Sequence, residues 1–448
     1  MTFKEFKDVV VAQCQEMGIA EYELYYQAGS STTVDTFQHG INEFTSSETG
    51  GVCFRCIVNG KMGYASTEAL NAEQAKAVVV RAADSASVLE SEEQVFLGEG
   101  GQAYEPLEDR SYELPTTEAL IAKVLETTEK LYAADAAAVD GCQTQGIVET
   151  GEVAIYNSKG MDLYQSTKAS GLVAVGVVSD GTEMAQDYQI KLGKLDEIDT
   201  DEMVAKAIRN AKEKLGGEVA PTGQYPVIFS PEAMTSLLGV YSGIFNSESA
   251  QKGLSKFAKA EGTVVAAPIV TLVDDPFHKD NPEPSNFDAE GSPTHCKKVI
   301  ENGVLNTLLY NLKTAAVAGK KTTGNASKAG YDAAVSICPF TMYLAGGELT
   351  EEQLLQKAGN GVYIHSLSGL HAGANAISGD FSLQSSGYMI EDGRKTKFVK
   401  SFTVAGNFYD LLKNITALAD NCKLPRAMGK TAFGSPSVLV DGLSVAGK

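Results

Sequence analysis

The chain has 448 residues, of which 43% are hydrophobic and 21% charged, a balance typical of a soluble globular protein with two or three domains. Its 37 basic and 57 acidic residues give a formal net charge of −20, which disfavours direct binding to DNA or RNA because phosphate contacts require basic surfaces. The longest apolar stretches, such as residues 264–273, are too short to span a bilayer, and the charged N-terminal segment lacks the pattern of a signal peptide. Seven cysteines, an odd number in so long a chain, favour a reducing cytosol over a disulfide framework.

The first predicted module, residues 1–110, has the order helix, strands, helix. An amphipathic pattern predicts a helix over Phe3–Met17, and strand-like sequence follows it. The Asn-Gly pair at 59–60 predicts a two-residue hairpin turn, because both turn positions need positive φ. A second helix is predicted over Ala72–Val88, and the acidic, glycine-rich stretch 90–110 is typical of a connector.

The second predicted module, residues 111–217, repeats this order. A helix is expected over 117–135, followed by strands whose turns fall at 158–160 and 180–181. A helix over 200–215 closes the module. The two modules share no sequence identity, so a structural repeat is a hypothesis based on element order alone.

The third predicted module, residues 222–448, follows a glycine- and proline-containing linker at 216–223. It begins with a strand and a helix, for which Ser230 is a good N-cap. Hairpin turns are expected at 302–303 and 392–393, and the remainder consists mostly of short strands with glycine turns. We therefore predict an α+β protein with an N-terminal α/β half of two helix–strands–helix modules and a C-terminal sheet-rich, barrel-like α+β domain.

The histidines and cysteines do not form a recognisable metal or redox motif. No histidine is followed by glutamate, and no two histidines are four or five residues apart, as a zinc hydrolase helix would require. Cys53 and Cys56 have C-x-x-C spacing but lie in a strand pattern without a second pair, which favours structural cysteines. We assign no catalytic residue and no metal ligand from these patterns.

A cluster of carboxylates is the strongest chemical signal in the third module. Asp274 and Asp275 end an apolar strand, Asp288 and Glu290 follow in a short loop, and His295 lies close behind them. Such a set could bind a hard cation or polarise water. The same residues could instead cap turns by accepting backbone N–H groups, and we favour this structural role.

Several segments in a fixed order resemble the TldD/PmbA family. They are residues 51–67, 255–276, 287–327 and 374–412, which together extend over most of the chain. Members of this family have been called modulators of DNA gyrase and are associated with a peptidase complex. In its TldD branch, a His-Glu-x-x-x-His motif on a helix early in the third module and a later cysteine hold a catalytic metal.

This chain departs from the metal-binding branch at both places. The approximate position of the motif is Leu237–Ser242, which contains no histidine, and Met428-Gly429-Lys430 stands where the metal branch has Cys-Gly-Lys. Cys422 lies six residues earlier, but a lone thiolate does not make a zinc site. The resemblance therefore implies the PmbA (TldE-like) branch, which lacks the metal ligands.

This branch implies a non-catalytic subunit that pairs with a TldD-like metallopeptidase and shapes the cavity for an unfolded peptide, in proteolysis or peptide maturation. Zinc is then expected only in the partner, and a homodimer of the isolated chain is an alternative assembly. The family segments supply the candidate cavity residues, which are Asp274, Asp275, Asp288, Glu290, Asn325, Asn375, Asp380 and Phe381. Two other functions remain open: a self-sufficient metal-dependent hydrolase that uses the carboxylate and histidine cluster, and a regulatory protein-binding factor of the gyrase-modulator kind.

Overall fold

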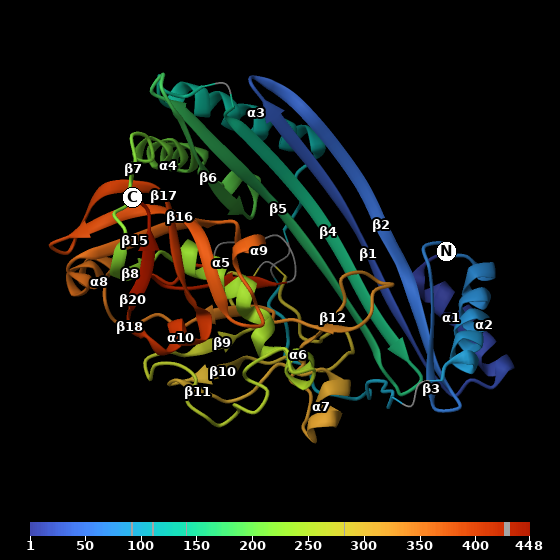
Figure 1. The fold of residues 1–448 in the computed structure, drawn as a ribbon. Coiled ribbons are helices and arrows are strands. Elements are labelled where there is room, and N and C mark those ends of the chain that lie inside the picture. Colours follow the sequence, from blue (N-terminus) through green and yellow to red (C-terminus); the bar gives the residue numbers. More distant parts are fainter. Residues whose placement is uncertain (91–92, 110–111, 140, 282, 425–430) are drawn as a thin grey trace.

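A computed structural model describes residues 1–90, 93–109, 112–139, 141–281, 283–424 and 431–448, and it shows a mixed α+β protein (Figure 1). The N-terminal half is built on one antiparallel sheet of six strands in the order β3-β2-β1-β4-β5-β6. These strands are β1 (Glu21–Phe37), β2 (Gly40–Val58), β3 (Lys61–Thr67), β4 (Gln143–Asn157), β5 (Asp162–Ser179) and β6 (Met184–Leu192). Because β1 pairs with β4, the strands of the first two predicted modules form a single continuous sheet.

Four helices cover one face of this long sheet, two at each end (Figure 1). They are α1 (Phe3–Met17), α2 (Ala72–Val88), α3 (Thr117–Ala134) and α4 (Thr200–Glu213), with the short η1 (Leu195–Glu197) before α4. Leu24 packs in the cluster under α1 and α2, whereas Val34 packs in the cluster under α3 and α4. Both residues have even numbers on β1, so their side chains point to the same side of the sheet. The opposite face is therefore left for the third module.

The predicted hairpin turn is present between β2 and β3. Asn59 and Gly60 have φ values of 52° and 76° and connect β2 to β3 as the predicted hairpin. Thr2 forms a capping box with Glu5 at the start of α1. Local sequence signals therefore fix the ends of these elements.

The third module contains a closed barrel, as predicted. Strand β20 pairs with β8 on one side and with β17 on the other, which closes the order β8-β15-β16-β17-β20 into a ring. The strands of this sheet are β7 (Glu218–Val219), β8 (Gly223–Phe229), β15 (Gly361–Ser368), β16 (Asp380–Glu391), β17 (Arg394–Asn407), β18 (Ile415–Leu418) and β20 (Val438–Ala446). The predicted linker at 216–223 is partly structured, because β7 pairs with β17 and the N–H of Thr222 donates to the carbonyl of Lys448.

The third module also contains a second, five-stranded sheet and several short helices. Its strands are β9 (Leu272–Asp274), β10 (Lys297–Glu301), β11 (Val304–Leu305), β14 (Thr341–Leu344) and β19 (Ala432–Gly434), and β12 (Ala326–Ser327) pairs separately with β13 (Ser336–Ile337). The helices are α5 (Pro231–Tyr241), η2 (Ser242–Phe245), α6 (Ser247–Gln251), α7 (Leu312–Ala318), α8 (Glu351–Ala358), α9 (Leu370–Gly373) and α10 (Phe408–Lys413). Among the described residues, none of the helices is both long enough and apolar enough to cross a bilayer.

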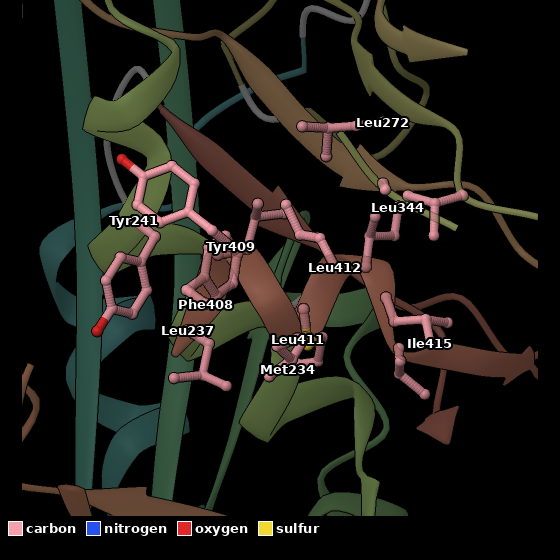
Figure 2. Packing of buried hydrophobic residues seen from close by; sticks show 14 of the residues in the cluster. Met234, Leu237, Tyr241, Leu272, Leu344, Phe408, Tyr409, Leu411, Leu412 and Ile415 are labelled. Carbon is pink, nitrogen blue, oxygen red and sulfur yellow. The ribbon is translucent and has the colours of Figure 1, made fainter. Parts of the chain in front are cut away.

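Helix α5 lies in the largest hydrophobic core of the protein (Figure 2). It begins at Ser230, whose side chain accepts a hydrogen bond from the N–H of Ala233. Tyr241 at its end stacks on Phe408 of α10 with ring centroids 4.5 Å apart, and Leu237 lies beside them with no exposed surface. The position of α5 is therefore set by apolar packing against α10 and the barrel.

Candidate functional site

A cavity of about 510 Å³ lies between the long sheet and the loops of the third module. Its floor is the face of the sheet that the four helices leave uncovered. The strand register pairs Gly29 of β1 with Thr49 of β2 and Gly151 of β4, so these residues share that face. The cavity thus crosses the middle of the sheet, and its size is that of an ordinary ligand site.

Small residues keep the floor of the cavity flat. A Cβ atom added at Gly51 would lie 2.5 Å from the ring of Tyr331, which packs directly on that glycine. Added Cβ atoms at Gly29 and Gly151 would each come within 2.6 Å of an oxygen atom on a neighbouring strand. Larger side chains in this row would therefore disturb the sheet or fill the cavity.

An apolar cluster closes one end of the cavity. Tyr25, Cys53 and Ile155 from the sheet pack there against Met161 and Phe287. All five side chains are buried. The sheet and the third module are thus in close contact at this end, and the cavity begins where the side chains become small.

Asp288 holds the loop that forms the opposite wall. Its carboxylate accepts hydrogen bonds from the N–H groups of Glu290, Ser292 and Ala326, each at 2.9 Å. The side chain is buried and lines the cavity. Burial and the nearby charge of Glu290 raise the pKa of Asp288, although the three N–H donors act in the opposite direction. Asp288 thus ties its own loop to the start of β12.

Asp274 supports the same wall through hydrogen bonds, and its side chain has no exposed surface. One carboxylate oxygen accepts from the N–H groups of Phe340 at 2.8 Å and Thr341 at 3.1 Å. The other accepts from the Lys297 ammonium at 3.1 Å and the Asn325 amide at 2.8 Å. Phe340 and the residue after Asn325 both line the cavity, so this buried carboxylate fixes two parts of the wall.

The other members of the predicted acidic cluster also contact the backbone or other buried charges. Glu290 accepts from the N–H of Leu312 at 2.8 Å, and burial raises its pKa while the charge of Arg55 lowers it. Asp275 accepts from the N–H of Phe277 within its own turn at 3.0 Å. Burial lowers the pKa of His295. Within the described residues, no three histidine, cysteine, aspartate or glutamate side chains are grouped so that they could hold a metal.

Three of the predicted cavity residues lie elsewhere, along a separate groove beside α9. Asn375 accepts from the N–H groups of residues 377 and 378, and Asp380 accepts from the Asn407 amide at 2.8 Å. Phe381 is buried in the barrel core. Of the eight predicted residues, Asp288 lines the cavity, and Asp274, Glu290 and Asn325 bond to the loops behind its wall. Asp275 lies in a turn of its own, and the other three lie at this groove.

Family comparisons agree with this fold along most of the chain. Residues 222–447 match the family model described as the PmbA/TldA metallopeptidase C-terminal domain. Residues 22–86 match domain 1 of the same family, and residues 111–215 match its central domain. The chain belongs to the PmbA/TldD family.

Relatives within the PmbA/TldD family share the fold at low sequence identity. The metalloprotease PmbA of Escherichia coli O157:H7 is 27% identical over 295 residues, which are 65% of this chain and 62% of that protein. A Thermotoga maritima structure described as a candidate modulator of a DNA gyrase is 29% identical with a TM-score of 0.90, covering 99% of this chain and 100% of that one. TldE from Thermococcus kodakarensis, at 22% identity and a TM-score of 0.88 over 98% and 99% of the two chains, supports the fold alone.

The residues at the approximate position of the PmbA/TldD metal motif do not fit a metal ion. Leu237 and Leu238 of α5 are fully buried in the core. Tyr241 donates to the carbonyl of Asp380 at 2.8 Å, and Ser242, directly after α5, donates to the carbonyl of Gly239 in that helix at 2.9 Å. Aliphatic side chains cannot coordinate zinc.

The second part of the expected motif is described only in part. Met428-Gly429-Lys430 lies outside the described residues. Cys422 contacts the carbonyl of Leu344 at 3.5 Å through its thiol. Burial raises the pKa of Cys422 to about 11, which keeps it a neutral thiol near pH 7.

The sequence analysis missed the floor of the cavity and one buried cation, Lys328. Alternation along β1 would have placed Tyr25, Gln27 and Gly29 on one face, but it does not say which face meets the third module. Lys328 directly follows β12 in a polar segment with no motif. Its position depends on contacts with a distant strand, for which the sequence holds no local signal.

Proposed function

We propose that this chain is a PmbA/TldE-like, non-catalytic subunit of a TldD-type metallopeptidase complex. It pairs with a metal-bearing TldD-like subunit in the cytoplasm and shapes the cavity in which an unfolded peptide is held for proteolysis or maturation. Zinc is supplied by the partner, and this chain contributes binding and positioning.

The burial of Leu237 and Leu238 is the observation that carries this proposal. A hydrolytic metal must face a site that substrate and water can reach, with three protein ligands around it. At the matching positions of α5, two leucines instead complete the apolar core. This helix therefore has a packing role, and a hydrolytic nucleophile has no source there.

The carboxylate cluster gives less support to the self-sufficient hydrolase. Asp274 and Asp288 already accept four and three hydrogen bonds respectively, most of them from backbone N–H groups. A cation would have to replace these donors and release the wall of the cavity. The contacts favour the structural role that the turn sequences suggested.

Co-expression with a family paralogue that carries the His-Glu-x-x-x-His motif tests this proposal. We expect the two chains to co-elute as one assembly in size-exclusion chromatography with light scattering, and the assembly to cleave an unfolded peptide. Replacement of the motif glutamate in the paralogue by glutamine should abolish cleavage without affecting co-elution. Separate elution at micromolar concentrations would contradict the pairing, and salt-sensitive retention of gyrase in its place would favour the regulatory alternative.

A further inference from the structure

Lys328 is a largely buried lysine at the cavity, and no carboxylate of the described residues forms an ion pair with it. Lys328 is only 7% exposed and lines the cavity. The ammonium lies 4.7 Å from the centre of the Tyr25 ring. Among the described residues, no hydrogen-bond acceptor or carboxylate lies within bonding distance of it. Lysine is almost never buried in this way unless it is paired, so the missing partner points to a ligand.

The groups that could act as a counter-ion to Lys328 are neutral, engaged elsewhere or too distant. The Cys53 thiol acts on Lys328, but burial raises its pKa and so favours the neutral thiol. Glu23 pairs with Arg55 at 2.7 Å, and the carboxylate of Asp288 is filled by three N–H donors. Asp332 influences Lys328 electrostatically but lies beyond ion-pair distance and is exposed to solvent. Burial lowers the pKa of Lys328, as expected for a cation without a close counter-ion.

We propose that Lys328 binds a carboxylate of a peptide that lies in the cavity between the long sheet and the third module. This inference rests on the proposed peptide-handling function and names one specific contact for it. A lysine ammonium offers three donors, and its bonds to carboxylates are among the strong hydrogen bonds of proteins. The carboxylate comes from the C-terminus of the peptide or from an acidic side chain.

The remainder of the cavity favours a ligand with little further negative charge. Glu149, Glu283 and Asp288 also line it, so a phosphate or another polyanion would be repelled. The flat floor at Gly29 and Gly151 leaves room for a backbone without large side chains above it. A mostly neutral peptide with one carboxylate near Lys328 meets both conditions.

Fluorescence anisotropy with the full-length chain, alone and with its metal-bearing partner, tests this contact. The probe is a short labelled peptide of alanine, serine and glycine, prepared with a free C-terminus and as the C-terminal amide. We expect the free acid to bind about 10- to 100-fold more tightly than the amide, because a hydrogen bond to a charged group increases affinity by about this factor. Lys328→Met should remove this difference and Lys328→Arg should retain it. Lys321→Met, at an exposed lysine seven positions earlier, is the matched control and should change nothing.

A third probe, the amide with one internal glutamate, identifies the source of the carboxylate. Tight binding of this probe assigns the contact to an acidic side chain, and weak binding assigns it to the C-terminus. Equal affinity of the wild type for all three probes would overturn the Lys328 contact and leave the subunit function standing. Failure of both the chain and the assembly to bind any of them would overturn both.

Chemical labelling provides a readout that does not depend on a variant. An amine-directed acylating reagent should modify Lys328 in the wild-type chain, and mass spectrometry gives the rate at that residue. The free-acid peptide should protect Lys328 at least about 10-fold, while the amide peptide should not. Equal protection by the free-acid peptide, the amide and the glutamate-containing amide would contradict the carboxylate contact.

Discussion

Replacing Asp274 by alanine is expected to lower the free energy of unfolding by about 3 to 5 kcal/mol. The change would leave the Lys297 ammonium buried without its counter-ion, and it would remove the acceptor for the Asn325 amide and for two backbone N–H groups. Each unsatisfied buried group adds a desolvation cost of its own. Urea-induced unfolding followed by circular dichroism measures this loss.

Asp275→Ala is the matched control for this prediction. The neighbouring carboxylate accepts one N–H within a partly exposed turn, so its loss should cost only about 1 kcal/mol. In the Asp274 background, Lys297→Met should restore part of the stability, because it removes the charge that was left unpaired. Equal and small effects of the two aspartate substitutions would show that Asp274 does not hold the wall.

Rebuilding the metal motif on α5 is expected to damage the fold and to create no metal site. Leu238→Glu places a carboxylate in a fully buried apolar position, and we expect a loss of about 3 to 5 kcal/mol. The triple variant Leu237→His, Leu238→Glu, Ser242→His should be destabilised at least as much. Thermal unfolding and zinc titration of both variants provide the measurement.

Ser236→Glu adds the same charge to the same helix at a partly exposed position and should cost less than about 1 kcal/mol. A stable triple variant that binds one zinc ion per chain would contradict the packing role of α5. It would also show that the helix can face an accessible site, which the present geometry does not provide.

The elements that could be predicted are those fixed by local chemistry. The capping residue Ser230 and the turns at 59–60 and 392–393 act over three or four residues, so the sequence around them is sufficient. The pairing of β1 with β4 joins segments more than a hundred residues apart, and no local pattern specifies it. For the same reason, the continuous sheet emerged only in the structure. The boundaries at 110 and 217 stay predictions.

The candidate site also contains some residues that the sequence could identify and others that only the structure reveals. Asp274 and Asp288 were identifiable because acids cluster in one short stretch of sequence. Only the structure shows which N–H groups donate hydrogen bonds to their carboxylates. Asn375 and Asp380 came from the same family segments but serve a turn in a different groove. Lys328 gave no signal, because its burial depends on Tyr25 of a distant strand. Contacts between the two halves of the chain were therefore the part that sequence patterns could not supply.

The metal content and peptidase activity of the purified chain test the central claim most directly. We predict that the chain, produced in zinc-supplemented medium and freed of weakly bound ions, carries far less than one transition-metal ion per molecule and does not cleave an unfolded peptide. Addition of the metal-bearing partner should produce cleavage that a chelator removes. One tightly held zinc or iron ion per chain, together with chelator-sensitive cleavage by the chain alone, would contradict the account.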